Sequence, residues 1–106
     1  MITSYQSARV TEPCPGIFRR ILAHSPRIML TEHTLEKNAV LPEHSHPHEQ
    51  LVYLLSGHLI LEMGGTLLDM VEGDSLVIPP DVPHKVTALE QSVALDIFTP
   101  AREDYL

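Results

Sequence analysis

Hydrophobic residues along the chain occur in many short runs, and turn-forming residues separate one run from the next. The run at residues 58–63 alternates and stops at Gly64-Gly65, a two-residue loop typical of a β-hairpin. This spacing predicts an all-β protein, either a sandwich or a barrel. The predicted strands cover residues 17–23, 27–36, 39–41, 51–55, 58–63, 66–70, 75–78, 85–88 and 93–98.

Length and composition favour a single domain. A chain of 106 residues can form one hydrophobic core, and 43% of its residues are hydrophobic, an ordinary share for a globular protein. The net charge of −7 argues against nucleic acid as a partner, because phosphates need a basic surface. An anionic small molecule would need local positive charge, which a metal dication could supply.

The only cysteine, Cys14, excludes an intrachain disulfide and fits a reducing compartment. Its position between Pro13 and Pro15 predicts a thiol in a loop. No apolar run approaches the roughly 18 residues of a membrane helix, and no basic region precedes a hydrophobic stretch at the N-terminus. We therefore expect a cytoplasmic protein without a membrane partner.

Three histidines and one glutamine are candidate metal ligands. His44 and His46 form an H-x-H pair, and on a strand both imidazoles would lie on one face because strand side chains alternate. Gln50 follows on the same parity, and His84 comes after the proline-rich segment 79–83. Three imidazoles and an amide oxygen suit one divalent ion, which could be Zn, Ni, Mn, Fe, Co or Cu.

Other interpretations of these residues stay open. His44 and His46 could be surface histidines at a strand end, and water could take the place of Gln50. By parity, His48 should face away from the ion and support the site indirectly. The remaining histidines show no informative spacing and are interpreted as ordinary strand or turn residues: His24, His33 and His58.

Two segments resemble the two sequence motifs of the cupin family. The first spans residues 38–57 and contains the H-x-H pair and the glutamine; the second spans residues 73–84 and ends in a histidine. Asn38 and Asp81 stand where the cupin pattern has glycine, but both residue types tolerate positive φ, so the turns can form. The resemblance implies a cupin double-stranded β-helix, or jelly-roll barrel, that binds one divalent metal through His44, His46, Gln50 and His84.

The resemblance also implies a domain organisation and an oligomeric state. It divides a single cupin domain, residues 1–106, into an N-terminal arm (1–15), a barrel (16–99) and a C-terminal tail (100–106) that could form a short helical turn. Small cupins usually form homodimers, often by exchange of an N-terminal strand. We therefore expect a homodimer in which the arm could reach a neighbour.

The C-terminal segment, residues 93–106, closely resembles the ending of the KdgF-type cupins of pectin and uronate breakdown. These proteins convert 4,5-unsaturated uronates to linear 4-deoxy-5-keto uronates. The resemblance therefore implies a metal-dependent enzyme with a small anionic, sugar-like substrate. It assigns catalytic importance to Asp96 and Arg102, with Phe98 lining the pocket.

Elementary chemistry makes these assignments plausible. Asp96 and Phe98 are two residues apart on a predicted strand, so both can face the interior. A carboxyl group between apolar side chains and a dication suits proton transfer. Arg102 could hold a substrate carboxylate through two parallel hydrogen bonds. Alternatively, Asp96 could be a structural acid, Phe98 a core residue and Arg102 a partner in a tail salt bridge.

Two other functions fit the same pattern. A three-histidine cupin site can hold iron or copper and bind oxygen, so a metal-dependent dioxygenase is the first alternative. The second is a non-enzymatic module that binds a metal or a sugar.

Overall fold

Ten β-strands and one short 3₁₀ helix make up the fold of the computed structural model, which describes residues 1–106. They are β1 (Val10–Cys14), β2 (Ile17–Ser25), β3 (Ile28–Leu35), β4 (Val40–His44), β5 (Glu49–Ser56), β6 (His58–Met63), β7 (Thr66–Val71), β8 (Ser75–Ile78), β9 (His84–Ala88), β10 (Ser92–Thr99) and η1 (Glu103–Tyr105). No helix has the length and apolar character needed to span a membrane.

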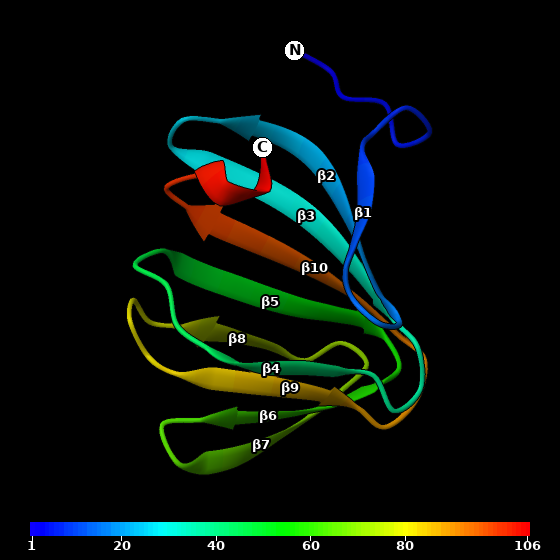
Figure 1. The fold of residues 1–106 in the computed structure, drawn as a ribbon, viewed down its shortest axis with the longest axis vertical. Helices are drawn as coiled ribbons and strands as arrows, with labels where there is room; N and C mark the ends of the chain where they lie inside the picture. Colours follow the sequence, from blue (N-terminus) through cyan, green and yellow to red (C-terminus); the bar gives the residue numbers. More distant parts are fainter.

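The strands form two antiparallel sheets that face each other (Figure 1). One sheet has six strands in the order β1-β2-β3-β10-β5-β8, and the other has four in the order β4-β9-β6-β7. Neighbouring strands are often distant in sequence, as where β10 lies between β3 and β5. The predicted all-β barrel is confirmed, and the site must be assembled from both sheets.

The turn residues behave as the sequence predicts. Gly64 and Gly65 connect β6 to β7, which pair up to the two residues that flank the loop, Met63 and Thr66. Asn38 and Asp81, the two residues that replace glycine in the cupin pattern, have φ angles of 72° and 65°. Both turns therefore form with positive φ, as residues of these types allow.

Strand β1 is the one strand that the hydrophobic pattern does not predict. It lies within the N-terminal arm and pairs with β2 of the same chain at the edge of the six-stranded sheet. Pro13 is tolerated there because an edge strand does not need every N–H group for the sheet. Cys14 ends β1, pairs with Ile17 and packs against the core, so the prediction of a loop thiol is wrong.

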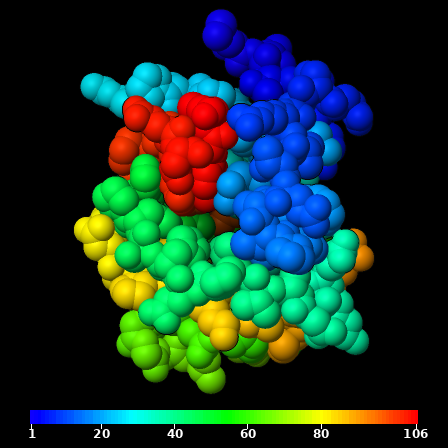
Figure 2. All heavy atoms as spheres, in the orientation of Figure 1, coloured from blue at the N-terminus to red at the C-terminus, as the bar shows by residue number.

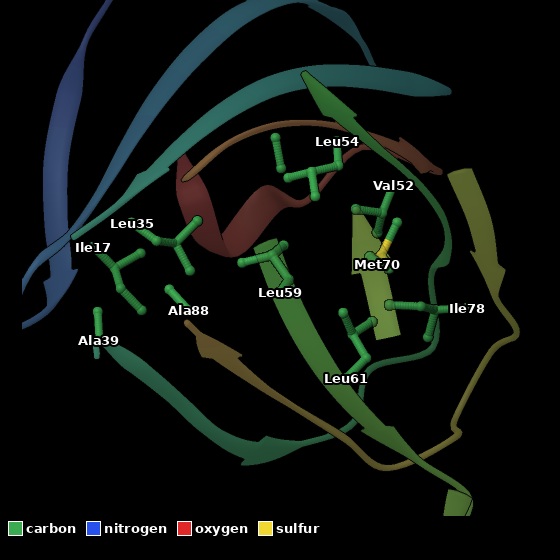
Figure 3. Packing of buried hydrophobic residues seen from close by; sticks show 11 residues of the cluster. Ile17, Leu35, Ala39, Val52, Leu54, Leu59, Leu61, Met70, Ile78 and Ala88 are labelled. Atoms are coloured by element: carbon green, nitrogen blue, oxygen red, sulfur yellow. The ribbon is translucent and has the colours of Figure 1, made fainter. Parts of the chain in front are cut away.

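The main hydrophobic core lies between the two sheets (Figure 3). Along β5 the burial alternates: Val52 and Leu54 are buried, whereas Leu51, Tyr53 and Leu55 are exposed. The core residues come from strands of both sheets and from the β3–β4 turn: Ile17, Leu35, Ala39, Val52, Leu54, Leu59, Leu61, Met70, Ile78, Ala88 and Ala94. Burial of each large aliphatic side chain contributes about 1.5–3 kcal/mol to folding.

The C-terminal tail folds back over a second, smaller cluster. Phe98 and Ala101 are buried there, and Tyr105 of η1 packs against them. Arg9 donates a hydrogen bond from Nη1 to the main-chain oxygen of Tyr105 at 3.4 Å. The C-terminal residues, red in Figure 2, accordingly lie next to the blue N-terminal segment. The tail does contain the helical turn that the sequence suggested.

Candidate metal centre and its acidic neighbour

Three histidines meet at one end of the barrel. His44 ends β4 and pairs with His84, the first residue of β9, while His46 lies in the connection between β4 and β5. One ring nitrogen of each lies within 4.8 Å of the others. The H-x-H pair therefore converges although only its first member is on a strand, so side-chain alternation is not the reason that the rings meet.

Hydrogen bonds to the main chain fix the tautomer of each ring. In all three, Nδ1 lies 2.8–3.1 Å from a main-chain carbonyl oxygen two residues away. The acceptors are the carbonyl groups of Pro42, His48 and Val82. A carbonyl only accepts, so Nδ1 carries the proton and Nε2 keeps its lone pair, as in metal-binding histidines. His48 stays outside the cluster of ring nitrogens and contributes through its main chain.

The surroundings also favour neutral rings. Burial, assisted by the positive charge of Arg102, lowers the pKa of His46 to about 4. Burial likewise lowers the pKa of His84. Only a neutral imidazole can act as a ligand. These two histidines are therefore in the metal-binding protonation state at neutral pH.

Gln50 directs an oxygen atom at the same place. Its Nε2 donates to Oδ1 of Asp96 at 2.9 Å, and its Oε1 lies 3.0 Å from Nε2 of His46. The opposite amide orientation would place Oε1 against the Asp96 carboxylate, so the orientation is determined by Asp96. Two atoms with lone pairs, Oε1 and His46 Nε2, then face each other without a proton between them.

A shared cation would satisfy this arrangement. A tetrahedral zinc ion with bonds of about 2.1 Å would set its ligand atoms about 3.4 Å apart. The ring nitrogens lie within 4.8 Å of one another, so the three rings would need to move inward to bind one ion. With that movement, the donor set fits a divalent ion held by the predicted residues His44, His46, Gln50 and His84.

Asp96 lies next to this cluster and is itself enclosed. The residue is 5% exposed, and its second oxygen, Oδ2, lies 2.7 Å from Nδ1 of His33. The far nitrogen of that ring, Nε2, accepts a hydrogen bond from Nε of Arg19 at 3.1 Å. His33 is thus no ordinary strand residue. No spacing in the sequence indicated this, because β3 and β10 are adjacent only in the folded chain.

Phe98 and Arg102 lie beside the cluster. The Phe98 ring is buried and meets the rings of His46 and Tyr105 edge-on, with centroids 5.9 and 5.7 Å away. Arg102 is 7% exposed and donates from Nε and Nη2 to the carboxylate of Asp104 at 3.0 and 2.8 Å. Its Nη1 is buried without a partner. Asp104 thus occupies Nε and Nη2, the paired donors expected to bind a substrate, and the Nη1 nitrogen remains without a partner.

A cavity is lined by most of these groups, although His46 and Arg102 are not among its lining residues. Most of its lining is hydrophobic, and its polar lining residues are His33, His44, Gln50, His84, Asp96 and Tyr105. The site thus combines candidate metal ligands, one enclosed carboxylate and an apolar wall.

Comparison with known proteins agrees with this geometry. The family model of the cupin domain matches residues 31–98. The chain belongs to the cupin family. This cupin is 31% identical over 93 residues to the pectin degradation protein KdgF of Dickeya dadantii, covering 86% of the chain and 84% of that protein.

Solved cupin structures match over nearly the whole chain. The structure of KdgF from Halomonas sp. aligns with a TM-score of 0.92 and 31% identity, covering 100% of this chain and 98% of that one. An RmlC-like cupin from Shewanella frigidimarina aligns with a TM-score of 0.93 and 26% identity, covering 99% and 95%. The cupin fold and the resemblance to KdgF proteins are confirmed.

Proposed function

We propose that this cupin is a metal-dependent enzyme that opens 4,5-unsaturated uronates and converts them to linear 4-deoxy-5-keto uronates. The observation that carries the proposal is the Asp96 carboxylate, which accepts a hydrogen bond at each oxygen, from Gln50 and from His33. It lies in the wall of the cavity that His44 and His84 also line. The similarity to two KdgF proteins supports the choice of substrate class.

One divalent ion would be held by His44, His46, His84 and Gln50. All four are neutral ligands, so the ion would keep its double charge. When bound, it would supply a Lewis acid for an anionic oxygen of the substrate. The local positive charge matters because the chain carries a net charge of −7.

Asp96 is our candidate for the proton transfer. The reaction is an isomerisation: the ring C–O bond of the hemiacetal breaks, the anomeric hydroxyl loses its proton and becomes a carbonyl, and the resulting enolate becomes a ketone as its carbon gains a proton. A single carboxylate can accept the first proton and return one to carbon. Its hydrogen bonds to Gln50 and His33 hold both oxygens in place, which favours such a transfer.

Arg102 is our candidate for binding the substrate carboxylate. Its Nη1 is a buried donor without a partner, and a buried unsatisfied donor costs about 1–3 kcal/mol. Arg102 does not itself line the cavity, but its guanidinium lies over the rings of Phe98 and Tyr105, which do, and a substrate carboxylate that reaches past these rings would satisfy the donor. Phe98, which lines the cavity, would pack against the substrate and keep water from the reacting atoms. The bidentate contact with Asp104 holds the guanidinium in position for this role.

A lyase-coupled assay tests the proposal. A pectate or alginate lyase generates unsaturated uronate, and the loss of its ultraviolet absorbance is followed with and without this protein. We expect faster loss that a chelator abolishes and that added divalent metal restores. The lyase with chelator alone is the control for effects on the coupling enzyme.

The outcome of this assay, followed by two further measurements, separates the alternative functions. A folded, metal-loaded sample that gives no acceleration would contradict the uronate reaction. Oxygen uptake with diketone or flavonoid substrates would then indicate the dioxygenase alternative. Sugar-acid binding without turnover would indicate the non-enzymatic one.

We also infer a homodimer, formed through the outer face of the six-stranded sheet. Leu51, Tyr53 and Leu55 of β5 and Val77 of β8 are each 40–46% exposed on that face, although all four are apolar or aromatic. Leu51 and Val77 are cross-strand partners, so the residues form one patch. Such patches mark interaction surfaces. Sedimentation should give twice the 11.8 kDa chain mass, and Tyr53→Lys should halve it; a monomeric wild type would contradict the inference.

A further inference from the structure

We propose that His33 is a positioning residue for Asp96 and that Arg19, which donates to the other nitrogen of the ring, holds the His33 ring in place. The inference rests on the proposed function of Asp96. It concerns two residues, on β2 and β3, that have no place in the metal-ligand set or in the roles proposed for Arg102 and Phe98.

The direction of each hydrogen bond follows from the chemistry of the groups. Arg19 has only donors, so the Nε2 of His33 that receives its hydrogen bond at 3.1 Å carries no proton. A neutral imidazole then has its proton on Nδ1, and this proton points to Oδ2 of Asp96 at 2.7 Å. Asp96, which only accepts, and Arg19, which only donates, therefore require the same tautomer, and the two hydrogen bonds hold the His33 ring from both sides.

The hydrogen bond from His33 completes the restraint of Asp96. Gln50 already donates to Oδ1, so a second donor on Oδ2 prevents the carboxylate from rotating about its own axis. The His33 and Asp96 side chains are only 12% and 7% exposed, so water does not readily replace either hydrogen bond. A restrained carboxylate presents the same lone pairs to each substrate molecule.

Arg19 is itself held by the C-terminal turn. Its Cζ lies 3.4 Å from the centroid of the Tyr105 ring, and Cζ of Arg102 lies 4.2 Å from the same centroid. The contacts therefore continue from Tyr105 through Arg19 and His33 to Asp96. Residues outside the set of candidate metal ligands thereby set the orientation of the Asp96 carboxylate.

A second histidine–aspartate pair provides a matched control. His58 and Asp69 are hydrogen-bonded on the four-stranded sheet, but their side chains are 29% and 63% exposed. Neither residue lines the cavity. Replacing His58 removes the same type of pair without touching the site.

The first experiment compares His33→Phe, His33→Gln and His58→Phe in the lyase-coupled assay. His33→Phe keeps a ring but removes the donor, and we expect kcat to fall about 10- to 100-fold, the range for residues that orient a reacting group. KM and metal content should stay at wild-type values. His33→Gln retains a donor and should recover part of kcat, while His58→Phe should match the wild type. Full kcat in His33→Phe would overturn the proposal.

Nitrogen NMR of the ¹⁵N-histidine-labelled protein gives a readout that does not depend on turnover. We expect His33 to be protonated on Nδ1 in the wild type and in Arg19→Met alike, because the Asp96 carboxylate only accepts. Arg19→Met should instead lower kcat, because the ring loses its second hydrogen bond, and Arg19→Lys should recover part of it; full kcat in Arg19→Met would remove Arg19 from the proposal. A wild-type ring protonated on Nε2 would overturn the proposal, including in the case that His33→Phe does not fold. If wild type lacks uronate turnover, the proposed function fails while the tautomer still tests the hydrogen bond from His33 to Asp96.

Discussion

The two ends of the barrel interior are built by the same strands but from opposite kinds of side chain. Along β5, the inward residue is Gln50 at one end and Leu54 at the other; along β10, Asp96 is followed toward the other end by Ala94. We call the first the site end, comprising His44, His46, Gln50, His84, Asp96 and Phe98. The second is the aliphatic end, comprising Ile17, Leu35, Ala39, Leu54, Leu59, Ala88 and Ala94.

The two ends contribute differently to the protein. The aliphatic end, most of which is labelled in Figure 3, is a cluster of buried apolar side chains and stabilises the fold. The site end holds the Asp96 carboxylate and the imidazoles of His46 and His84 away from water, and the unpartnered Nη1 of Arg102 is buried beside it; burial of each of these polar groups costs free energy. The difference teaches that stability and chemistry are separated along single strands, and substitutions should separate them too.

The largest effect is expected from Asp96→Asn at the site end. Asparagine presents an NH₂ group to one of the two donors that Asp96 now accepts, and it cannot take up the substrate proton. We expect kcat in the lyase-coupled assay to fall about 100- to 10,000-fold, the usual contribution of a general base. Metal content, measured by elemental analysis, should remain that of the wild type.

Asp69→Asn is the matched control, because Asp69 also pairs with a histidine but lies outside the site. It should keep wild-type kcat. Equal activity in Asp96→Asn and wild type would remove Asp96 from the proposed reaction and would erase the functional contrast between the two ends.

At the aliphatic end, Leu54→Ala should show the reverse behaviour. Leu54 is fully buried and does not line the cavity. Loss of its side chain should lower the free energy of unfolding by about 2–5 kcal/mol through lost burial and the cavity left behind. Urea denaturation measures this, and kcat at a temperature where the variant stays folded should remain within a few-fold of wild type. A large loss of kcat in folded Leu54→Ala would contradict the separation.

A drop in pH should lower the free energy of unfolding through a residue of the site end. In the unfolded chain a histidine gains its proton near pH 6.5, whereas burial holds the pKa of folded His46 at about 4. Between these values the unfolded chain binds more protons, so the free energy of unfolding falls as pH drops through this window. The loss attributable to His46 is about 3 kcal/mol at and below pH 4.

Urea titrations of metal-free protein at several pH values between 7 and 4 measure this dependence. The variant His46→Asn should show a shallower pH dependence than wild type, and the exposed control His24→Asn should not. Identical slopes in wild type and His46→Asn would show that His46 is not held neutral by burial.

Sequence patterns predicted the parts of this protein that depend on local signals. Strands separated by turn residues, the hairpin at Gly64-Gly65 and the positive φ angles at Asn38 and Asp81 are local, and the structure contains them. The histidine cluster could be found because its members have a recognisable spacing in the chain, and the structure brings His44, His46 and His84 together. Strand β1 escaped prediction because Pro13 weakens its pattern and its edge position tolerates the proline.

The neighbours of Asp96 could not be found in the same way. His33 and Asp96 meet because β3 and β10 are adjacent, and that register is a property of the whole fold. Arg102 could be picked out from the C-terminal segment, but its use of two donors on Asp104 depends on the conformation of the tail. Contacts between distant strands carry no spacing signal, so the support of a site is harder to predict than its ligands.

The smallest effect is expected at the boundary between the two ends. Val52 lies between Gln50 and Leu54 on β5, belongs to the core cluster and also lines the cavity. Val52→Ala removes two carbons, so the free energy of unfolding should fall by about 1–2 kcal/mol. KM for the uronate should change by a few-fold at most, because the lost atoms belong to the apolar wall rather than to the ligands or the acid. A kcat loss as large as that of Asp96→Asn would show that the site end extends beyond Gln50 into the core.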